Sequence, residues 1–186
     1  MILISCASIF YGRISDMSIS KKSFLERPVS VLFVCLGNIC RSPTAHGVFE
    51  KHVLELGLSD LISIDSAATA AFHIGSPPDP RTISAAAARG YDLSQQISRQ
   101  ICLEDFYHFD FILPMDRMNL GNLKALQPKD FKGQLALFMD FSKQRQYSQV
   151  PDPYTDGPEG FELVLNLVED ASQGLLEHIR REKLQA

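Results

Sequence analysis

Val31-Leu32-Phe33-Val34-Cys35-Leu36-Gly37-Asn38-Ile39-Cys40-Arg41-Ser42-Pro43 is the stretch that decides the fold of this 186-residue chain. Its first four residues are apolar and predict a short buried strand. Gly37 and Asn38 tolerate unusual backbone angles, as a tight loop requires, and Pro43 suits the first turn of a helix. Residues 43–56 then predict that helix. The stretch therefore indicates a strand, a loop and a helix in succession.

The rest of the chain repeats this alternation of short apolar runs and helical segments. Strands are expected at 61–67, 109–115 and 135–141, and helices at 79–90, 116–126 and 160–183. Strands that alternate with helices form a parallel sheet covered on both faces, with ligands bound beyond the carboxyl ends of the strands. We therefore expect an α/β fold, a single three-layer α/β/α domain with a four-stranded parallel sheet and a binding loop after the first strand.

The first 29 residues differ from the rest, because they show no sustained hydrophobic period and are rich in Ser. We interpret residues 1–29 as an N-terminal extension, either a flexible tail or the product of an upstream start with Met17 as the initiator. An organellar address is the alternative. Residues 30–186 would then form one folded domain, a size that a single hydrophobic core supports.

The composition is that of an ordinary globular protein, with 45% hydrophobic and 22% charged residues. A formal net charge of −4 argues against binding to nucleic acid or to an anionic membrane. No apolar run approaches the roughly 18 residues that span a bilayer, and no signal peptide is expected. Four cysteines at irregular spacing favour a reducing cytoplasm and offer no zinc motif. We expect a cytoplasmic monomer without metal or cofactor.

The loop from Cys35 to Arg41 has the chemistry of an anion site. Because it leaves a strand and enters a helix, its backbone N–H groups can surround one oxyanion at the positive end of the helix dipole. The Arg41 guanidinium adds a charged donor, and the same groups favour a thiolate over a thiol at Cys35. Ser42 can donate a hydrogen bond to that sulfur. The sequence thus predicts a phosphate-binding loop with a nucleophilic cysteine.

The spacing of Cys35 and Arg41 is by itself a weak indication, because a Cys and an Arg six positions apart often occur by chance. A buried, inert thiol is the alternative, since free cysteines are commonly buried. That alternative leaves an arginine beside the core unexplained. The position of the motif between strand and helix therefore favours the anion site.

A second candidate element is Pro151-Asp152-Pro153-Tyr154, in a loop rich in turn residues. Cleavage of an aryl phosphate by a thiolate expels a tyrosyl oxygen, and an acid that protonates this oxygen accelerates the step by about 10²- to 10⁴-fold. Asp152 is our candidate for that acid, and its carboxylate would later deprotonate water. Taken alone, Asp152 is typical of a turn. Its pairing with the Cys35 loop favours the catalytic role.

Both elements resemble the low-molecular-weight protein tyrosine phosphatases, whose C-L-G-N-I-C-R-S-P loop and D-P-Y acid loop both occur here. The resemblance covers about residues 31–183. It implies hydrolysis of phosphotyrosine in protein substrates, and of small aryl phosphates, through a phosphocysteine intermediate and without metal. The site residues that it implies are catalytic Cys35, Arg41 and Asp152, and substrate-binding Leu36, Gly37, Asn38, Ile39, Cys40, Ser42 and Tyr154.

Several other residues keep two interpretations. By the resemblance, Cys40 forms a reversible disulfide with the nucleophile, and simple packing is the alternative. Asp116 either caps a helix or organises the phosphate loop, and Phe72 either lines the cleft or lies in the core. Two positions depart from the family pattern. Thr155 replaces a second Tyr, which puts part of the aromatic stacking in doubt, and Gln96 replaces a His that supports the phosphate loop.

Two other functions remain open on the sequence. Arsenate reductases share this fold and loop but relay oxidation through two further cysteines, and only Cys102 lies downstream of the loop here. An inactive phosphate-binding module is the second alternative. The presence of Cys35, Arg41 and Asp152 argues against it.

Overall fold

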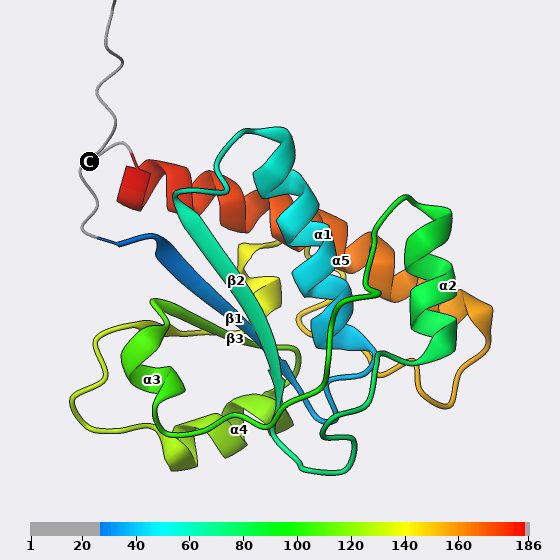
Figure 1. The fold of residues 1–186 in the computed structure, drawn as a ribbon, viewed down its shortest axis with the longest axis horizontal. Coiled ribbons are helices and arrows are strands. Elements are labelled where there is room, and N and C mark those ends of the chain that lie inside the picture. Colours follow the sequence, from blue (N-terminus) through cyan, green and yellow to red (C-terminus); the bar gives the residue numbers. More distant parts are fainter. Residues whose placement is uncertain (1–26, 185–186) are drawn as a thin grey trace, which may run out of the picture.

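The computed structural model describes residues 27–184, so the expectations for residues 1–26 lie outside the described part of the chain. Its centre is a sheet of four parallel strands, β1 (Val29–Cys35), β2 (Ile62–Ala68), β3 (Phe111–Pro114) and β4 (Gln134–Leu135). Their order across the sheet is β2-β1-β3-β4, which leaves β1 in the interior (Figure 1). The expected α/β class and four-stranded parallel sheet are confirmed. β1 begins one residue before the expected start of the domain.

Helices cover both faces of the sheet (Figure 1). α1 (Arg41–Glu55) and α5 (Pro158–Ile179) pack on one face, and α3 (Asp105–His108) and α4 (Arg117–Leu126) on the other. α2 (Pro80–Ala88) packs against α5. The three-layer arrangement is therefore the expected one. Within residues 27–184, no helix combines the length and the apolar composition needed to cross a bilayer.

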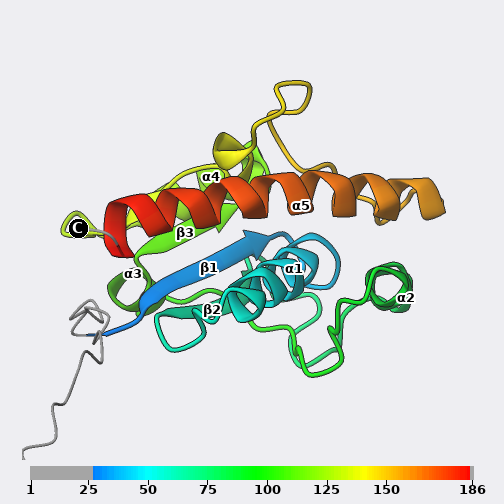
Figure 2. The same ribbon diagram turned by 90° about the horizontal axis from the view of Figure 1, so that it is seen from above.

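β1 is the strand that joins the two halves of the core. Val31 and Phe33 pack among residues of α1 and α5, whereas Leu32 and Val34 pack among residues of α3 and α4. Phe33 makes an edge-to-face contact with Phe49 of α1, with 5.7 Å between the ring centroids. Figure 2 shows β1 running along α5, with its carboxyl end leading into the loop before α1. Burial on both faces holds that end of the strand, and the loop that follows it, in one place.

The structure departs from the expected elements at three places. A strand was expected at 135–141, but only Gln134–Leu135 joins the sheet, and Phe138–Phe141 form a 3₁₀ helix, η1. Phe138 is nevertheless buried in the core, so the apolar run reflects packing and not strand pairing. α3 has no counterpart among the expected elements, because a four-residue helix carries no readable period. The last helix begins earlier than expected, at Pro158, and continues beyond Ile179 as the π-helical segment η2 (Arg180–Leu184).

Candidate active site

The loop between β1 and α1 folds back around the sulfur of Cys35. Cys35 is the last residue of β1 and Arg41 the first of α1. The backbone N–H of Asn38 donates to Cys35 Sγ at 3.2 Å, and Ser42 Oγ lies 3.0 Å from the same sulfur. A sulfur that receives donors from its own loop is stabilised as a thiolate.

Asn38 holds the shape of this loop with its side chain. It has a positive φ of 53°, a conformation that costs energy for a residue with a Cβ. Its Nδ2 donates to Ser42 Oγ and to Ser66 Oγ, both at 2.9 Å, and its Oδ1 accepts from the Arg99 N–H at 3.1 Å. Because the Ser42 hydroxyl accepts from Asn38, its single hydrogen is free to point toward Cys35 Sγ, the nearer of its two possible acceptors.

Ser66 and Ser98 support the loop from outside it, and neither was assigned a role from the sequence. Ser66 is near the carboxyl end of β2, opposite Phe33 in the register of the sheet. Ser98 Oγ donates to the carbonyl of Gly37 at 3.1 Å. Ser66 is buried beside Ala67 and Ala68 at the carboxyl end of β2, and this place at the end of a strand is the signal that could have indicated it.

Arg41 is a buried cation between two carboxylates. Its side chain is 4% exposed, with Nη1 2.6 Å from Asp116 Oδ2 and Nη2 2.7 Å from Asp152 Oδ2. Burial lowers the pKa of Arg41, but the negative charges of Cys35, Asp152 and Asp116 outweigh burial and raise it above its ordinary value. The guanidinium therefore remains charged and fixed beside the sulfur, as a phosphate-binding cation must be.

Asp116 performs both of the roles considered for it. Its Oδ1 accepts from the Asn119 N–H at 2.7 Å as the N-cap of α4, while its Oδ2 binds Arg41. Helix capping and organisation of the phosphate loop are thus not alternatives, because a carboxylate has two oxygens that can do both.

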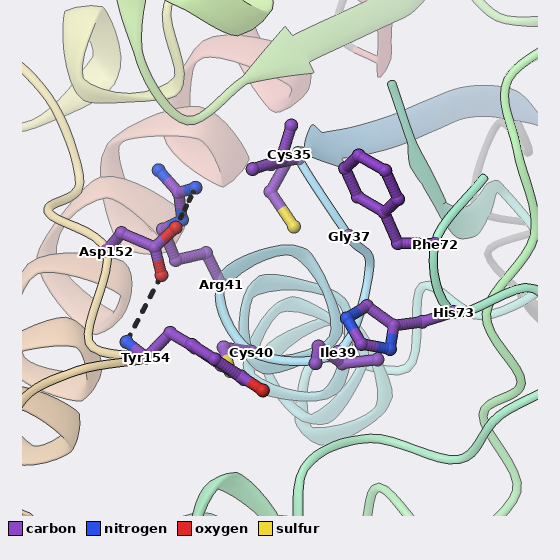
Figure 3. Close-up of a pocket in the computed structure, with 10 residues that line it drawn as sticks. Cys35, Gly37, Ile39, Cys40, Arg41, Phe72, His73, Asp152 and Tyr154 are labelled. Carbon is purple, nitrogen blue, oxygen red and sulfur yellow. Dashed lines mark hydrogen bonds and ion pairs between the residues drawn. The ribbon is translucent and has the colours of Figure 1, made fainter. Parts of the chain in front are cut away.

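Asp152 reaches the loop from a distant part of the chain. Its side chain is 44% exposed, and its Oδ1 accepts from the Tyr154 N–H at 3.3 Å (Figure 3). The residue before the acid loop is also fixed, since the Val150 N–H donates to the Met115 carbonyl at the end of β3 at 2.9 Å. The carboxylate is held at the loop and remains accessible to a ligand.

These elements surround a pocket of about 250 Å³. In Figure 3, Arg41 and Asp152 lie on one side of Cys35, and Phe72 and His73 on the other. The lining residues are Cys35, Leu36, Gly37, Ile39, Cys40, Arg41, Phe72, His73, Asp152 and Tyr154. All predicted site residues are at this pocket except Asn38 and Ser42, which lie behind the loop and shape it.

Two of the lining residues come from the segment after β2. Phe72 is 76% exposed, so the interpretation that places it in the core is wrong. His73 was not predicted. A Cβ at Gly37 would lie 3.0 Å from the His73 ring, so a larger residue at this position would require the histidine to shift slightly away from the loop. Gln96, which departs from the family pattern, donates from Nε2 to the Pro43 carbonyl at 3.1 Å.

Cys40 is a second buried thiol in the same loop. It packs with Ile39 and Phe161, and burial raises its pKa to about 11. Cys35 and Cys40 are both free thiols. At neutral pH Cys40 is therefore protonated and does not compete as a nucleophile. Across residues 27–184, no group of His, Cys, Asp and Glu side chains is arranged to hold a metal ion.

Comparison with known proteins points to one family. Residues 30–185 match the family model described as low molecular weight phosphotyrosine protein phosphatase. A putative low molecular weight protein-tyrosine-phosphatase from Synechocystis is 40% identical over 155 residues, covering 83% of this chain and 98% of the relative. The low molecular weight phosphotyrosine protein phosphatase of Rattus norvegicus is 46% identical over 137 residues, covering 73% and 85%. A crystal structure of a protein tyrosine phosphatase from Entamoeba histolytica superposes with a TM-score of 0.80 at 37% identity, covering 84% of this chain and 99% of that one.

Proposed function

The chain belongs to the low molecular weight phosphotyrosine protein phosphatase family, and from that membership we propose which residues carry out its reaction. The enzyme is a cysteine-based hydrolase of phosphotyrosine. We assign Cys35 as the nucleophile, Arg41 as the phosphate-binding cation and Asp152 as the general acid. One observation carries this assignment. The Cys35 sulfur lies 3.0 Å from Ser42 Oγ and accepts from the Asn38 N–H at 3.2 Å, in a pocket that Arg41 and Asp152 also line.

In the first step the Cys35 thiolate attacks the phosphorus, and the bond from phosphorus to the tyrosyl oxygen breaks. Asp152, protonated, gives its proton to that oxygen, so the product leaves as neutral tyrosine. Arg41 and the loop N–H groups neutralise the charge on the three phosphoryl oxygens as it redistributes. The products of this step are tyrosine and a phosphocysteine.

In the second step Asp152, now a carboxylate, takes a proton from water as the water oxygen attacks the phosphorus. The bond between phosphorus and sulfur breaks, and inorganic phosphate leaves. The sulfur departs as a thiolate, which the Asn38 N–H and the Ser42 hydroxyl stabilise. These two donors support the assignment of Cys35, because they favour the thiolate form of its sulfur both when it attacks and when it leaves.

The substrate ring needs apolar walls above the phosphate. Leu36, Phe72 and Tyr154 are exposed side chains at the pocket and can provide them. The backbone of Gly37, Ile39 and Cys40 would lie along the phosphate. Thr155 does not line the pocket, so we propose that Phe72 and Tyr154 are the aromatic residues that contact the substrate.

The substrates are phosphoproteins of the kind that the family acts on. We further propose that the enzyme works in the cytoplasm as a monomer, without nucleic acid, membrane, metal or cofactor. The net charge of −4 supports the first two of these exclusions. Arsenate reduction is not favoured, because every relative and structure named above is a tyrosine phosphatase.

Turnover of a chromogenic aryl phosphate and of a phosphotyrosine peptide, without added metal, tests the proposal. We expect both to be hydrolysed by the wild-type enzyme, and neither measurably by Cys35→Ser. Rapid acid quenching should trap a phosphoryl group on Cys35, detected by peptide mass. Cys102→Ser, which changes an exposed thiol outside the pocket, is the control and should retain full activity. Substantial turnover by Cys35→Ser would overturn the covalent mechanism.

A further inference from the structure

A second groove adjoins the catalytic pocket on the side of Arg41 and Asp152. It has a volume of about 540 Å³, more than the pocket itself, and shares Leu36, Arg41 and Asp152 with it. Its other walls are the start of α4, including Met118, and the loop of residues 146–151. The groove is therefore continuous with the proposed phosphotyrosine-binding pocket, but it is not needed to bind either the phosphate or the aromatic ring.

The walls of this groove are held in position by hydrogen bonds. The Arg117 N–H donates to Gln149 Oε1 at 2.7 Å, which ties the loop to the start of α4. The Val150 N–H donates to the Met115 carbonyl at 2.9 Å, which ties the same loop to the end of β3. Asp116 fixes the start of α4 through its cap and its ion pair with Arg41. A groove with fixed walls binds a ligand at a lower entropic cost than one that must form first.

The lining of the groove fits a polypeptide without charged side chains. Gln146 and Gln149 carry amide groups, which both donate and accept hydrogen bonds and so match the polar groups of a peptide backbone. Met118 is 73% exposed and is a flexible apolar side chain that adapts to different partners. Arg41 is the only Lys or Arg in the lining, and two carboxylates already pair with it.

The charge of the groove also disfavours one class of ligand. Asp116 and Asp152, 22% and 44% exposed, are its accessible charges. An acidic side chain placed there would meet like charges and find no free cation among the lining residues. An apolar or neutral side chain would instead cover Met118 and remove its surface from water.

We propose that this groove binds the residues that flank phosphotyrosine in an extended segment of a protein substrate, and that it prefers apolar and neutral residues to acidic ones. The proposal rests on the function assigned to the adjoining pocket. It names a specificity determinant of that reaction, because contacts beside the phosphotyrosine would separate peptide substrates that share the same phosphorylated residue.

Kinetics with paired substrates test it. Three substrates are compared: a chromogenic aryl phosphate, which occupies the catalytic pocket alone, a phosphotyrosine peptide with Leu and Ala flanks, and the same peptide with Glu flanks. For the wild-type enzyme we expect a higher kcat/KM with the apolar flanks than with the acidic ones. Met118→Gln keeps the length of the side chain but not its apolar character, and we expect it to lower kcat/KM for the apolar peptide about 3- to 10-fold. Turnover of the aryl phosphate should change by less than about 2-fold.

Leu54→Gln is the matched control, because Leu54 is 66% exposed on α1 and is not among the lining residues of the groove. It should change none of the three rates. Equal effects of Met118→Gln on peptide and aryl phosphate, or no effect on either, would overturn the proposal. Peptide affinity can also be measured in the Cys35→Ser background, where no turnover is needed. This measurement tests the groove separately from the catalytic mechanism assigned to Cys35. A 3- to 10-fold weaker affinity on adding Met118→Gln supports the groove even if the mechanism at Cys35 is wrong, and an unchanged affinity rejects it.

Discussion

Arg41 and Asp152 are joined by an ion pair, with Arg41 Nη2 2.7 Å from Asp152 Oδ2. The proposed phosphate-binding cation and the proposed acid, 111 positions apart in the chain, are thus parts of one charged group. Asp116 completes it by binding the other nitrogen of the guanidinium at 2.6 Å. The acid loop and the phosphate loop are therefore positioned relative to one another by a single side chain.

Replacement of that side chain by Arg41→Lys should lower kcat/KM for an aryl phosphate by about 100-fold or more. A lysine keeps the charge, but its one nitrogen cannot bind Asp116 and Asp152 together and cannot give phosphate two parallel hydrogen bonds. Steady-state kinetics at saturating and limiting substrate measure the effect. Arg181→Lys, at an exposed arginine in η2 outside the pocket lining, is the control, and its activity should remain close to wild type. A loss below about 5-fold for Arg41→Lys would contradict the role of the bidentate guanidinium.

For Asp152→Ala we expect a loss that depends on the leaving group. With phosphotyrosine, kcat should fall by about 10²- to 10⁴-fold, because the tyrosyl oxygen then leaves without its proton. With an aryl phosphate whose phenol is more acidic, the loss should be smaller. A plot of log kcat against leaving-group pKa for both enzymes measures this, and a steeper slope is expected for the variant. Asp156→Ala, in the same exposed loop, should leave the slope unchanged. Parallel plots for Asp152→Ala and the wild type would reject the general-acid assignment.

Asn38 allows the hydrogen bonds of the loop to be separated from its backbone strain. Asn38→Ala loses three hydrogen bonds and keeps an unfavourable φ, so it should lower the free energy of unfolding by about 2 kcal/mol and also lower kcat. Asn38→Gly loses the same bonds but accepts the positive φ, and should recover about 1 kcal/mol of stability without recovering kcat. Urea denaturation and steady-state kinetics measure the two effects. If glycine restores kcat, the loop depends on its backbone angle and not on the amide network.

The fold could be predicted from the sequence wherever a residue pattern is compatible with only one kind of local structure. The continuous apolar run at Val31–Val34 corresponds to a strand buried on both faces, and Asp79 before a proline marks the start of α2, where it accepts from the Arg81 N–H. The run at 135–141 has two explanations, a strand or a buried 3₁₀ segment, and composition does not separate them. Such a choice depends on tertiary packing.

Some residues of the candidate site could be predicted from the sequence and others could not. The residues of the phosphate loop are contiguous, so their spacing and their place between strand and helix made them recognisable. Ser66, Ser98 and His73 reach the loop only through the register of β2 and the path of the loops that follow it. Their positions depend on which strands are neighbours, and a single sequence does not state that.

Cys40→Ser should leave activity largely intact but change the response to peroxide. The Cys35 thiolate would be oxidised to a sulfenic acid, and the Cys40 thiol would then attack that sulfur, release water and form a disulfide that a thiol reductant can reverse. Because burial raises the pKa of Cys40 to about 11, Cys40 is the resolving thiol and not the one first oxidised. Activity after peroxide and then dithiothreitol is the measurement. We expect recovery for the wild type and for Cys102→Ser, and little for Cys40→Ser. Full recovery of Cys40→Ser would leave packing as the role of this residue.

A pH dependence of stability is expected from His46, on α1. Burial lowers its pKa below the ordinary value, although the charges of Glu50 and Asp65 oppose the shift. The Nδ1 atom is buried and has no hydrogen-bond partner among residues 27–184. As pH falls through the pKa of the unfolded chain, the unfolded state takes up a proton that the folded state does not, so the free energy of unfolding must fall with it.

Urea denaturation at about pH 7.5 and pH 5.5, on either side of the ordinary histidine pKa, measures this loss. His46→Gln cannot take up the proton in either state, so the free energy of unfolding should fall less between the two pH values than it does in the wild type. Some loss should remain, because burial also lowers the pKa of His52. Leu54→Gln, at an exposed position on the same helix that carries no titratable group, serves as the control and should behave as the wild type does. An equal fall in His46→Gln and the wild type would mean that the buried imidazole does not limit stability in acid.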